Sequence, residues 1–562
     1  MFRSKTTSAP QWLPLPEEPQ GGRKLAEWLF FGLLLALGML LVADYGVSWD
    51  EANNHLNGLV NLKYLASLLP VGEGLRQHPT FAITPDIRDF PDAHHGPLFE
   101  MAAVVVNFLF TDHDSRSYFL VRHLMVFGVF VGGVWAVYQL ARRWLGSWRW
   151  GLLAAALLVA SPRFFAEAFY NGKDIVFMAC FTLAMHTLAR LLARPTPSRA
   201  LVHGLAIALA AGIRVQGLQL LLFTALGLAL TAAAGHYRPQ PAARPAYGRM
   251  GALVVVAALG GLVSIWPYLW VHSLPKLLDV SAHAMHYPWK FTNLYWGQFY
   301  KSAGVPWHYV PVWLLITTPV GYSLAAAVGL GAVGWRWGQA LARRVWPAGP
   351  GPALDALVAT WLLGPIGVVI LMGASIYDGW RHLYFVYPAL VLLAARGVQL
   401  VWCRSRQPGR GRQLALAGLA VFGLATAHTV WRMARMHPFQ NLYFSFLSAP
   451  AAERLFERDY WGLSYRRGLE WLLANQPTGP VRINVTVPNY HPLYNNSLML
   501  PAAQRHRIQY VPLAEADYFM GAYRWHPQAY PDTLGTEIYT LRVEGIKTLS
   551  IFRRPRAGAA RR

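Results

Sequence analysis

The sequence has few charged residues and almost no cysteine. Charged side chains make up 14% of its 562 residues, whereas a soluble domain usually carries about 25%. The two cysteines, Cys180 and Cys403, lie in or beside apolar segments, so a disulfide framework or a cysteine-based metal site is excluded. Acidic residues are the scarcer charge, 27 against 50 Lys and Arg, which gives a net charge of +23. This composition excludes an ordinary soluble protein.

The basic residues gather in short connectors between apolar segments. Acidic residues are rare in the same connectors, which is typical of cytoplasmic loops in a membrane protein. A nucleic-acid partner, the other interpretation of a strongly basic chain, is therefore not expected. The N-terminal tail and the five connectors contain Arg3, Lys5, Arg23 and Lys24; Arg142, Arg143 and Arg149; Arg190, Arg194 and Arg199; Arg238, Arg244 and Arg249; Arg336, Arg343 and Arg344; and Arg404, Arg406, Arg410 and Arg412.

Uncharged stretches recur from residue 25 to about residue 430. The first, residues 25–43, is long enough to span a bilayer, and no small-residue cleavage site follows it, so it does not resemble a signal peptide. If every basic connector is cytoplasmic, an even number of crossings must separate each from the next. This predicts a polytopic α-helical membrane protein with about eleven transmembrane helices, the N-terminus inside and the C-terminus outside. The predicted spans are 25–43, 119–141, 150–168, 175–192, 200–213, a second arm ending before residue 238, 250–271, 309–333, 354–374, 382–402 and 414–430.

The first external loop, residues 44–118, is acidic, with ten Asp and Glu against four Lys and Arg. Its apolar stretch, residues 97–111, is shorter than the ~20 residues of a usual span. We therefore expect a helix lying on the outer surface. The predicted organisation is a cytoplasmic tail (1–24), a transmembrane domain (25–430) and a periplasmic α/β domain (431–562). The last of these has a helix-like stretch at 462–474, a strand-like stretch at 481–487 and a β pair at 538–543 and 547–552.

An acidic pair, Asp50-Glu51, follows the first hydrophobic segment by six or seven residues. One interpretation is a general base held just above the bilayer, where a hydroxyl acceptor and a lipid-linked donor meet. The other is an exposed acidic loop. The preceding residue, Trp49, favours a lined site.

Arg381 opens a hydrophobic helix on the predicted outer side. A guanidinium at this depth suits a phosphate at the headgroup level, although an interfacial anchor is the alternative. Arg214, at the turn of a predicted hairpin, has the same two interpretations.

Two further pairs of charged residues lie near the outer ends of segments. Lys173 and Asp174 either neutralise each other or belong to the site. Arg163 and Glu167, four residues apart on a helix, are expected to pair with each other.

The histidines do not predict a metal site. His94 and His95 are adjacent, so in a helix or a strand their side chains diverge. Zincin spacing and a Cys/His cluster are both missing from the sequence. No cofactor is therefore predicted, although a divalent metal remains possible.

These residues together resemble the GT-C glycosyltransferases of family 39, which include protein O-mannosyltransferases and the aminoarabinose transferases that modify lipid A. The resemblance spans about residues 25–400, and Gly96 departs from it where a proline is usual. It rests on Asp50-Glu51, on Asp92-Ala93-His94-His95-Gly96-Pro97-Leu98, on Lys173-Asp174, on Val305-Pro306-Trp307-His308-Tyr309-Val310-Pro311, and on Arg381-His382-Leu383-Tyr384 continuing to Tyr387-Pro388.

The resemblance implies transfer of a sugar from a polyprenyl-phosphate donor to an acceptor hydroxyl, with inversion, at the outer face of a bacterial inner membrane. A phosphate leaves without a general acid, so one carboxylate and several cations suffice. It implies Asp50 as the base. Supporting roles are implied for Glu51 and Asp174 near the acceptor, and for Arg381, His382, His95, Lys173 and Arg214 around the donor phosphate.

The acceptor stays open, since the tail beyond residue 431 does not resemble the MIR domain of eukaryotic members; it is a hydroxyl of a protein, a lipid or a glycan. The alternatives are a transporter or flippase, which would need broken helices around a midplane site, and another carrier-lipid enzyme such as an O-antigen-type ligase.

Overall fold

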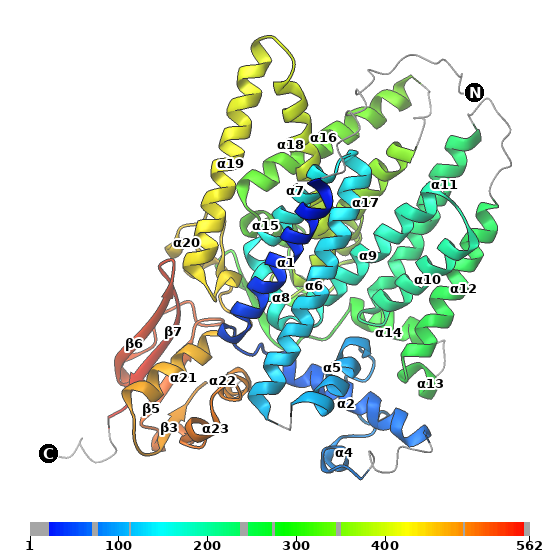
Figure 1. Cartoon of the computed structure of the whole chain (residues 1–562). Helices are drawn as coiled ribbons and strands as arrows, with labels where there is room; N and C mark the ends of the chain where they lie inside the picture. Colours follow the sequence, from blue (N-terminus) through cyan, green and yellow to red (C-terminus); the bar gives the residue numbers. More distant parts are fainter. Residues whose placement is uncertain are drawn as a thin grey trace.

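A computed structural model describes residues 22–69, 77–111, 114–236, 246–272, 276–343, 350–486 and 489–555. Long helices form a bundle, and a small α/β region lies at one end of it (Figure 1). The predicted polytopic helical fold with a small sheet-containing region is confirmed. Residues 1–21 of the predicted tail and the basic residues Arg238, Arg244 and Arg344 lie outside the described residues.

Eight of the described helical segments are long and apolar enough to cross a membrane, or ten segments if each of two bent pairs is one span. A further apolar helix, α10 (Pro197–Ala211), has only 15 residues and corresponds to the short predicted arm at 200–213. The eight segments contain α1 (Arg23–Leu41), α6 (Ser115–Leu145), α9 (Asp174–Ala193), α11 (Leu220–His236), α12 (Tyr247–Ile265), α17 (Pro350–Met372), α18 (Tyr387–Ser405) and α19 (Arg410–Met436).

Two of the predicted straight spans are broken. Residues 150–168 fall in α7 (Trp148–Val159) and α8 (Pro162–Tyr170), which meet at 71°. Residues 309–333 fall in α15 (Tyr309–Thr317) and α16 (Val320–Ala342), which meet at 119°. A proline follows each break, at 162 and at 319. Proline lacks the N–H that continues a helix and disfavours the helical conformation of the residue before it.

The helix ends follow local sequence signals. At the start of α6 the side chain of Asp114 accepts a hydrogen bond from the backbone N–H of Ser117, which satisfies one of the unpaired donors of a helix N-terminus. The same helix ends at Gly146, whose φ of 79° suits glycine. Ser147 then caps α7 by accepting from the N–H of Arg149.

Short helices lie across the end of the bundle that carries the α/β region (Figure 1). They are α2 (Glu51–Leu68), α4 (Pro79–Ile83) and α5 (Leu98–Phe110). Residues 97–111 thus form a short helix of 13 residues, as expected. Gly58 of α2 permits close contact between α2 and α5, because a Cβ on residue 58 would press on the backbone of Glu100 in α5.

The α/β region follows α19. Its five-stranded sheet has the order β4-β3-β5-β7-β6, in which β3 is parallel to β4 and β5 whereas β7 is antiparallel to β5 and β6. The predicted helix at 462–474 and the β pair are present, but β4 and β5 were not predicted. The elements are α20 (Ala449–Leu455), α21 (Ser464–Asn475), β3 (Val481–Asn484), α22 (Tyr490–Ser497), α23 (Ala502–Arg505), β4 (Ile508–Tyr510), β5 (Tyr518–Ala522), β6 (Thr536–Val543) and β7 (Ile546–Arg553).

Helix α8 lies inside the bundle, and all nine of its residues are buried. Its rings stack on those of neighbouring helices: Phe164 on Tyr387 at 4.0 Å between centroids, and Phe169 on Phe127 at 4.7 Å. The polar segment 171–174 follows this buried helix directly in the sequence. The bundle core therefore holds that polar segment in place.

Helices α16 and α18 approach so closely that only glycine fits between them. A Cβ on Gly397 would overlap the backbone oxygen of Ala325, whereas a Cβ on Gly423, in α19, would meet nothing within 4 Å. We predict that Gly397→Ala destabilises the protein by about 3 kcal/mol, the upper range for overpacking. Gly423→Ala is the matched control and should be neutral or slightly stabilising, because alanine favours helix. Thermal unfolding in detergent measures both; equal melting temperatures would contradict the close contact.

Candidate active site

A cavity of about 580 Å³ opens where the bundle, the first loop and the α/β region meet. Its wall has three parts of different chemistry. The charged part contains Asp50, Lys173, Arg214 and Arg381; the apolar part contains Pro365, Val368, Val369, Met372, Leu383 and Phe385; and the aromatic part contains Trp49, Tyr287, Trp289, Tyr377, His382 and His491.

These four charged residues each stand where a helical element begins. Asp50 is the N-cap of α2, and its side chain makes no capping hydrogen bond. Lys173 and Arg214 precede α9 and η4 (Val215–Gln219), and Arg381 is the first residue of η6 (Arg381–Val386). Four segments that are distant in sequence therefore direct charged groups to one place.

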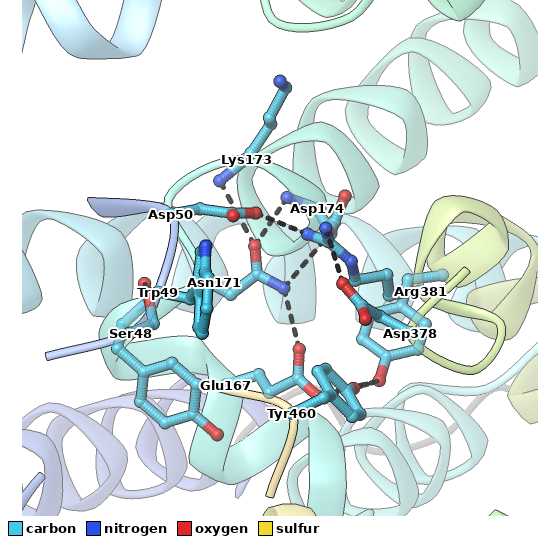
Figure 2. Close-up of polar contacts among 12 residues, drawn as sticks. Ser48, Trp49, Asp50, Glu167, Asn171, Lys173, Asp174, Asp378, Arg381 and Tyr460 are labelled. Carbon is cyan, nitrogen blue, oxygen red and sulfur yellow. Dashed lines mark hydrogen bonds and ion pairs between the residues drawn. The ribbon is translucent and has the colours of Figure 1, made fainter. Parts of the chain in front are cut away.

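Arg381 is the centre of the charge network, as Figure 2 shows. Its Nη1 lies 2.7 Å from Oδ2 of Asp50 and 3.4 Å from Oδ2 of Asp174, and its Nη2 lies 3.0 Å from Oδ2 of Asp378. The guanidinium also packs over the rings of Tyr377 and Trp461. Arg381 is 4% exposed. The arginine predicted for a phosphate thus contacts the carboxylate predicted as the base.

Asp174 supports two arginines of the cavity wall by forming ion pairs with them. It pairs with Arg214 as well as with Arg381. Asn171 fixes it by donating from Nδ2 to Oδ2 of Asp174 at 3.1 Å and to Oε2 of Glu167 at 2.7 Å (Figure 2). Asp174 is 1% exposed and lies outside the set of described residues that line the cavity. Its geometry therefore suits orientation of Arg214 and Arg381 rather than contact with an acceptor.

Glu51 does not lie where the sequence predicts it, which is beside Asp50 near the acceptor. It is fully buried and lies outside the described residues that line the cavity. Its Oε1 lies 3.3 Å from Nε of Arg122 and 3.0 Å from Nε2 of His123, both in α6, and its Oε2 accepts from the N–H of Ser48 at 2.7 Å. Successive residues at a helix start point about 100° apart, so Asp50 and Glu51 diverge. Glu51 anchors α2 to α6.

Lys173 does not neutralise Asp174, which already has Arg214 and Arg381. Figure 2 shows the Lys173 ammonium directed away from Asp50 and Asp174. Burial and the charge of Arg214 lower the pKa of Lys173 to about 8. It is a cation of the cavity wall that is available to an anionic ligand at neutral pH.

His95 and His382, for which donor contacts are predicted, both line the cavity. His382 packs edge-on against Tyr377 with 4.4 Å between ring centroids. Burial and the positive charge of Lys173 hold the pKa of His95 well below its usual value. His95 is therefore neutral and offers a hydrogen bond rather than a charge.

The expected divergence of His94 and His95 is wrong. They lie in a turn, and their ring centroids are 4.4 Å apart. With Asp92 they form a group whose ligand atoms lie within 4.8 Å of one another. These three residues are the part of the described chain that could hold a divalent metal, a possibility that the sequence left open.

The predicted pairing of Arg163 with Glu167 is also wrong. Arg163 donates to the backbone oxygen of Tyr443 at 3.2 Å and packs over the ring of Trp313. Glu167 accepts from the hydroxyl of Tyr460 at 3.1 Å and from other buried donors. Spacing of four residues favours pairing on an exposed face, but α8 is buried, so other helices supply the partners.

The cations make Asp50 more acidic. Burial opposes its ionisation, but the charges of Arg381, Lys173 and Arg524 outweigh this effect and hold the pKa of Asp50 below its usual value. Asp50 is therefore a carboxylate throughout the neutral range and can accept a proton.

Sequence reasoning missed Asn171 and the partner of Asp378. Arg524, 146 residues further along the chain, forms an ion pair with Asp378. No local signal marks either contact. Trp49, which was noted only for preceding the acidic pair, does line the cavity.

Fold and site together define a polytopic membrane protein with a charged cavity at one end of the bundle. Residues 94–266 match the sequence family described as Dolichyl-phosphate-mannose-protein mannosyltransferase, which confirms the predicted resemblance over that segment. The segment is under a third of the 562 residues, and it contains His95, Lys173 and Arg214. No curated protein sequence matches the chain.

Three solved structures with a similar arrangement are distant in sequence. ArnT from Cupriavidus metallidurans in the apo state is 13% identical, with a TM-score of 0.47 over 94% of this chain and 98% of that one. The same protein bound to undecaprenyl phosphate is 14% identical, with a TM-score of 0.47 over 95% and 98%. The apo oligosaccharyltransferase of Archaeoglobus fulgidus is 11% identical, with a TM-score of 0.47 over 89% and 70%.

The charge of Lys173 gives a pH-dependent prediction. Because its pKa is lowered to about 8, the ammonium is present below that pH and is lost as the pH rises through it. Affinity for a phosphate ligand, measured with undecaprenyl phosphate in nanodiscs, should fall above about pH 8. Lys173→Arg keeps its charge and should move this fall to higher pH.

Lys276→Arg is the matched control, because Lys276 is exposed and pairs with Asp279. It should leave the pH dependence of the affinity unchanged. The same alkaline fall in wild type and Lys173→Arg would show that Lys173 does not contribute.

Proposed function

We propose that the cavity is the active site of an inverting glycosyltransferase. It would move a sugar from a polyprenyl-phosphate donor to an acceptor hydroxyl at the non-cytoplasmic face of a bacterial inner membrane. The observation that carries this proposal is the 2.7 Å contact of Arg381 with Asp50 in a cavity that also has an apolar wall on a membrane helix. A base, a phosphate-binding cation and a path for a lipid tail meet in one place.

The cavity suits both parts of such a donor. Lys173, Arg214 and Arg381 offer charge-assisted hydrogen bonds to a phosphate. The apolar wall on α17 includes Val368 and Met372, which are 50% and 56% exposed on the outside of the bundle. A prenyl chain in the bilayer can therefore lie along α17 while its phosphate reaches the cations.

The chemistry needs few groups. The acceptor oxygen attacks the anomeric carbon from the face opposite the phosphate, which inverts that centre, and the bond from the anomeric carbon to the phosphate oxygen breaks. Asp50 takes the proton of the acceptor hydroxyl. The phosphate leaves as an anion on the cations, so no general acid is required, in contrast to glycosidases with two carboxylates. Asp174 supports the reaction by holding Arg381 and Arg214.

Sidedness rests on two observations. The short helices of the first loop and the α/β region lie at the same end of the bundle (Figure 1). The α18–α19 connection lies at the opposite end, with Arg404 in the last turn of α18, Arg406 in the connection and Arg410 at the start of α19. The positive-inside rule supports a cytoplasmic location for the second end, and we therefore propose that the cavity, the α/β region and the C-terminus lie outside. The N-terminus is then cytoplasmic.

A lipid transporter is the second candidate, because the two broken helix pairs meet one requirement of that class. However, none of the described residues of α7, α8, α15 or α16 lines the cavity. The breaks therefore do not open onto the cavity, and glycosyl transfer is the better supported function.

We predict that Asp50→Asn reduces sugar transfer from a polyprenyl-phosphate donor by about 10²–10⁴-fold, the usual contribution of a general base. The asparagine keeps the size of the side chain but cannot accept the proton as a carboxylate does. Transfer of radiolabelled sugar in reconstituted vesicles measures the effect. The transporter alternative makes a different prediction for Asp50→Asn. A transporter that does not use this base would flip the carrier lipid at the wild-type rate in the same vesicles.

Asp89→Asn is the control, since Asp89 is an exposed residue of the same loop. It should transfer sugar at the wild-type rate. Full transfer by Asp50→Asn would remove Asp50 as the base.

A further inference from the structure

The backbone before Asp50 is held by residues of the α/β region. Asn496, in α22, accepts from the N–H of Val47 at 3.1 Å and donates to its oxygen at 3.0 Å. Arg466 donates to the oxygen of Tyr45 at 2.7 Å, and the N–H of Trp49 donates to the oxygen of Trp461 at 3.0 Å. These groups supply hydrogen-bond partners to the segment 45–49, whose residues belong to no helix or strand.

Arg524 reaches the charge network from the same region. It follows β5, is 3% exposed, and forms an ion pair with Asp378. Its Nη1 donates to the backbone oxygen of Tyr460 at 3.1 Å. Its guanidinium packs over the rings of Trp49 and Trp525, at 5.2 and 4.2 Å from their centroids. It therefore contacts the residue before the base as well as a carboxylate partner of Arg381.

Asp378 links the two arginines. Its Oδ1 pairs with Arg524, while its Oδ2 lies 3.0 Å from Nη2 of Arg381. Its φ is 58°, an uncommon value for a residue with a side chain, and its N–H donates to Oδ1 of Asn293 at 3.2 Å. The carboxylate is thus fixed between two cations and is not free to turn wholly toward Arg381.

We propose that the α/β region is a positioning element of the active site: Arg524 balances Asp378 so that Arg381 stays directed at Asp50 and the donor phosphate, and Asn496 fixes the backbone that carries Asp50. This inference rests on the proposed function. Arg524 and Asn496 are positioning residues, because each acts through another group.

The proposal has a specific electrostatic consequence. Without Arg524, Asp378 is a buried carboxylate with one cation, and it draws the Arg381 guanidinium toward itself. Arg381 then loses its alignment with Asp50 and the phosphate. Removing the charge of Asp378 as well removes this competition, so the second substitution should restore what the first one lost.

The test compares Arg524→Met with the double variant Arg524→Met/Asp378→Asn in the full-length protein. A displacement of about 1 Å at a catalytic group can cost about 10²-fold, so the single variant should lose about 100-fold in kcat/KM for the donor. The double variant should recover at least about tenfold of that loss. Arg482→Met, which breaks the exposed Arg482–Asp517 pair of the same sheet, is the matched control and should retain wild-type kcat/KM.

A purely structural role for Arg524 would instead lower the melting temperature of the single variant together with its kcat/KM. The proposal is overturned if Arg524→Met has wild-type kcat/KM, or if the double variant is no better than the single one while both melt at the wild-type temperature.

Hydrogen exchange separates this inference from the proposed function. In Asn496→Ala the amide of Val47 loses its acceptor, so peptides covering residues 45–50 should exchange at least about tenfold faster, while peptides of β6 and β7 stay protected. This result requires no knowledge of the substrate. If wild-type protein transfers no sugar, the proposed function fails. Unchanged exchange at residues 45–50 in Asn496→Ala would by itself overturn the positioning role.

Discussion

A buried guanidinium costs several kcal/mol to desolvate, and because arginine stays protonated in proteins, buried partners must offset that cost. Arg381 has three such partners, Asp50, Asp174 and Asp378. Each partner comes from a different part of the chain, so the ion pairs join the first loop, the start of α9 and the start of η6. This end of the bundle is thus linked through one cation, and further polar contacts hold Asp174 and Asp378 in place.

Under the proposed function, this arrangement explains how one site can serve both halves of a transfer reaction. In the ligand-free protein Arg381 neutralises Asp50, which would otherwise repel an incoming phosphate. When a phosphate binds, Arg381 is shared between the phosphate and the carboxylate, and the proton acceptor and the leaving group are then held by the same guanidinium. Lys173, which is not engaged by Asp174, provides additional positive charge at the cavity wall.

Much of the architecture could be predicted from sequence, because the bilayer imposes a minimum length on apolar segments and the arginines reveal the side of each connector. That reasoning placed Asp50, Lys173, Arg214 and Arg381 at one end of the molecule, where they share the cavity. The errors arose where tertiary packing overrides local pattern. The four-residue spacing of Arg163 and Glu167 carries no weight in a helix buried on all sides, and His94 and His95 converge because their segment is a turn. Arg524 lies 146 residues from Asp378, and no local pattern records such a contact.

Competition between Asp50 and a donor phosphate for Arg381 is the central claim, and carrier-lipid affinity tests it most directly. The dissociation constant of undecaprenyl phosphate should be measured for wild type and Asp50→Asn in nanodiscs at neutral pH. Removing the charge of Asp50 frees Arg381 and removes a repulsion, so the variant should bind the carrier at least about tenfold more tightly, a difference of about 1.4 kcal/mol, although it no longer transfers sugar. Affinity that is unchanged or weaker in Asp50→Asn would contradict the account.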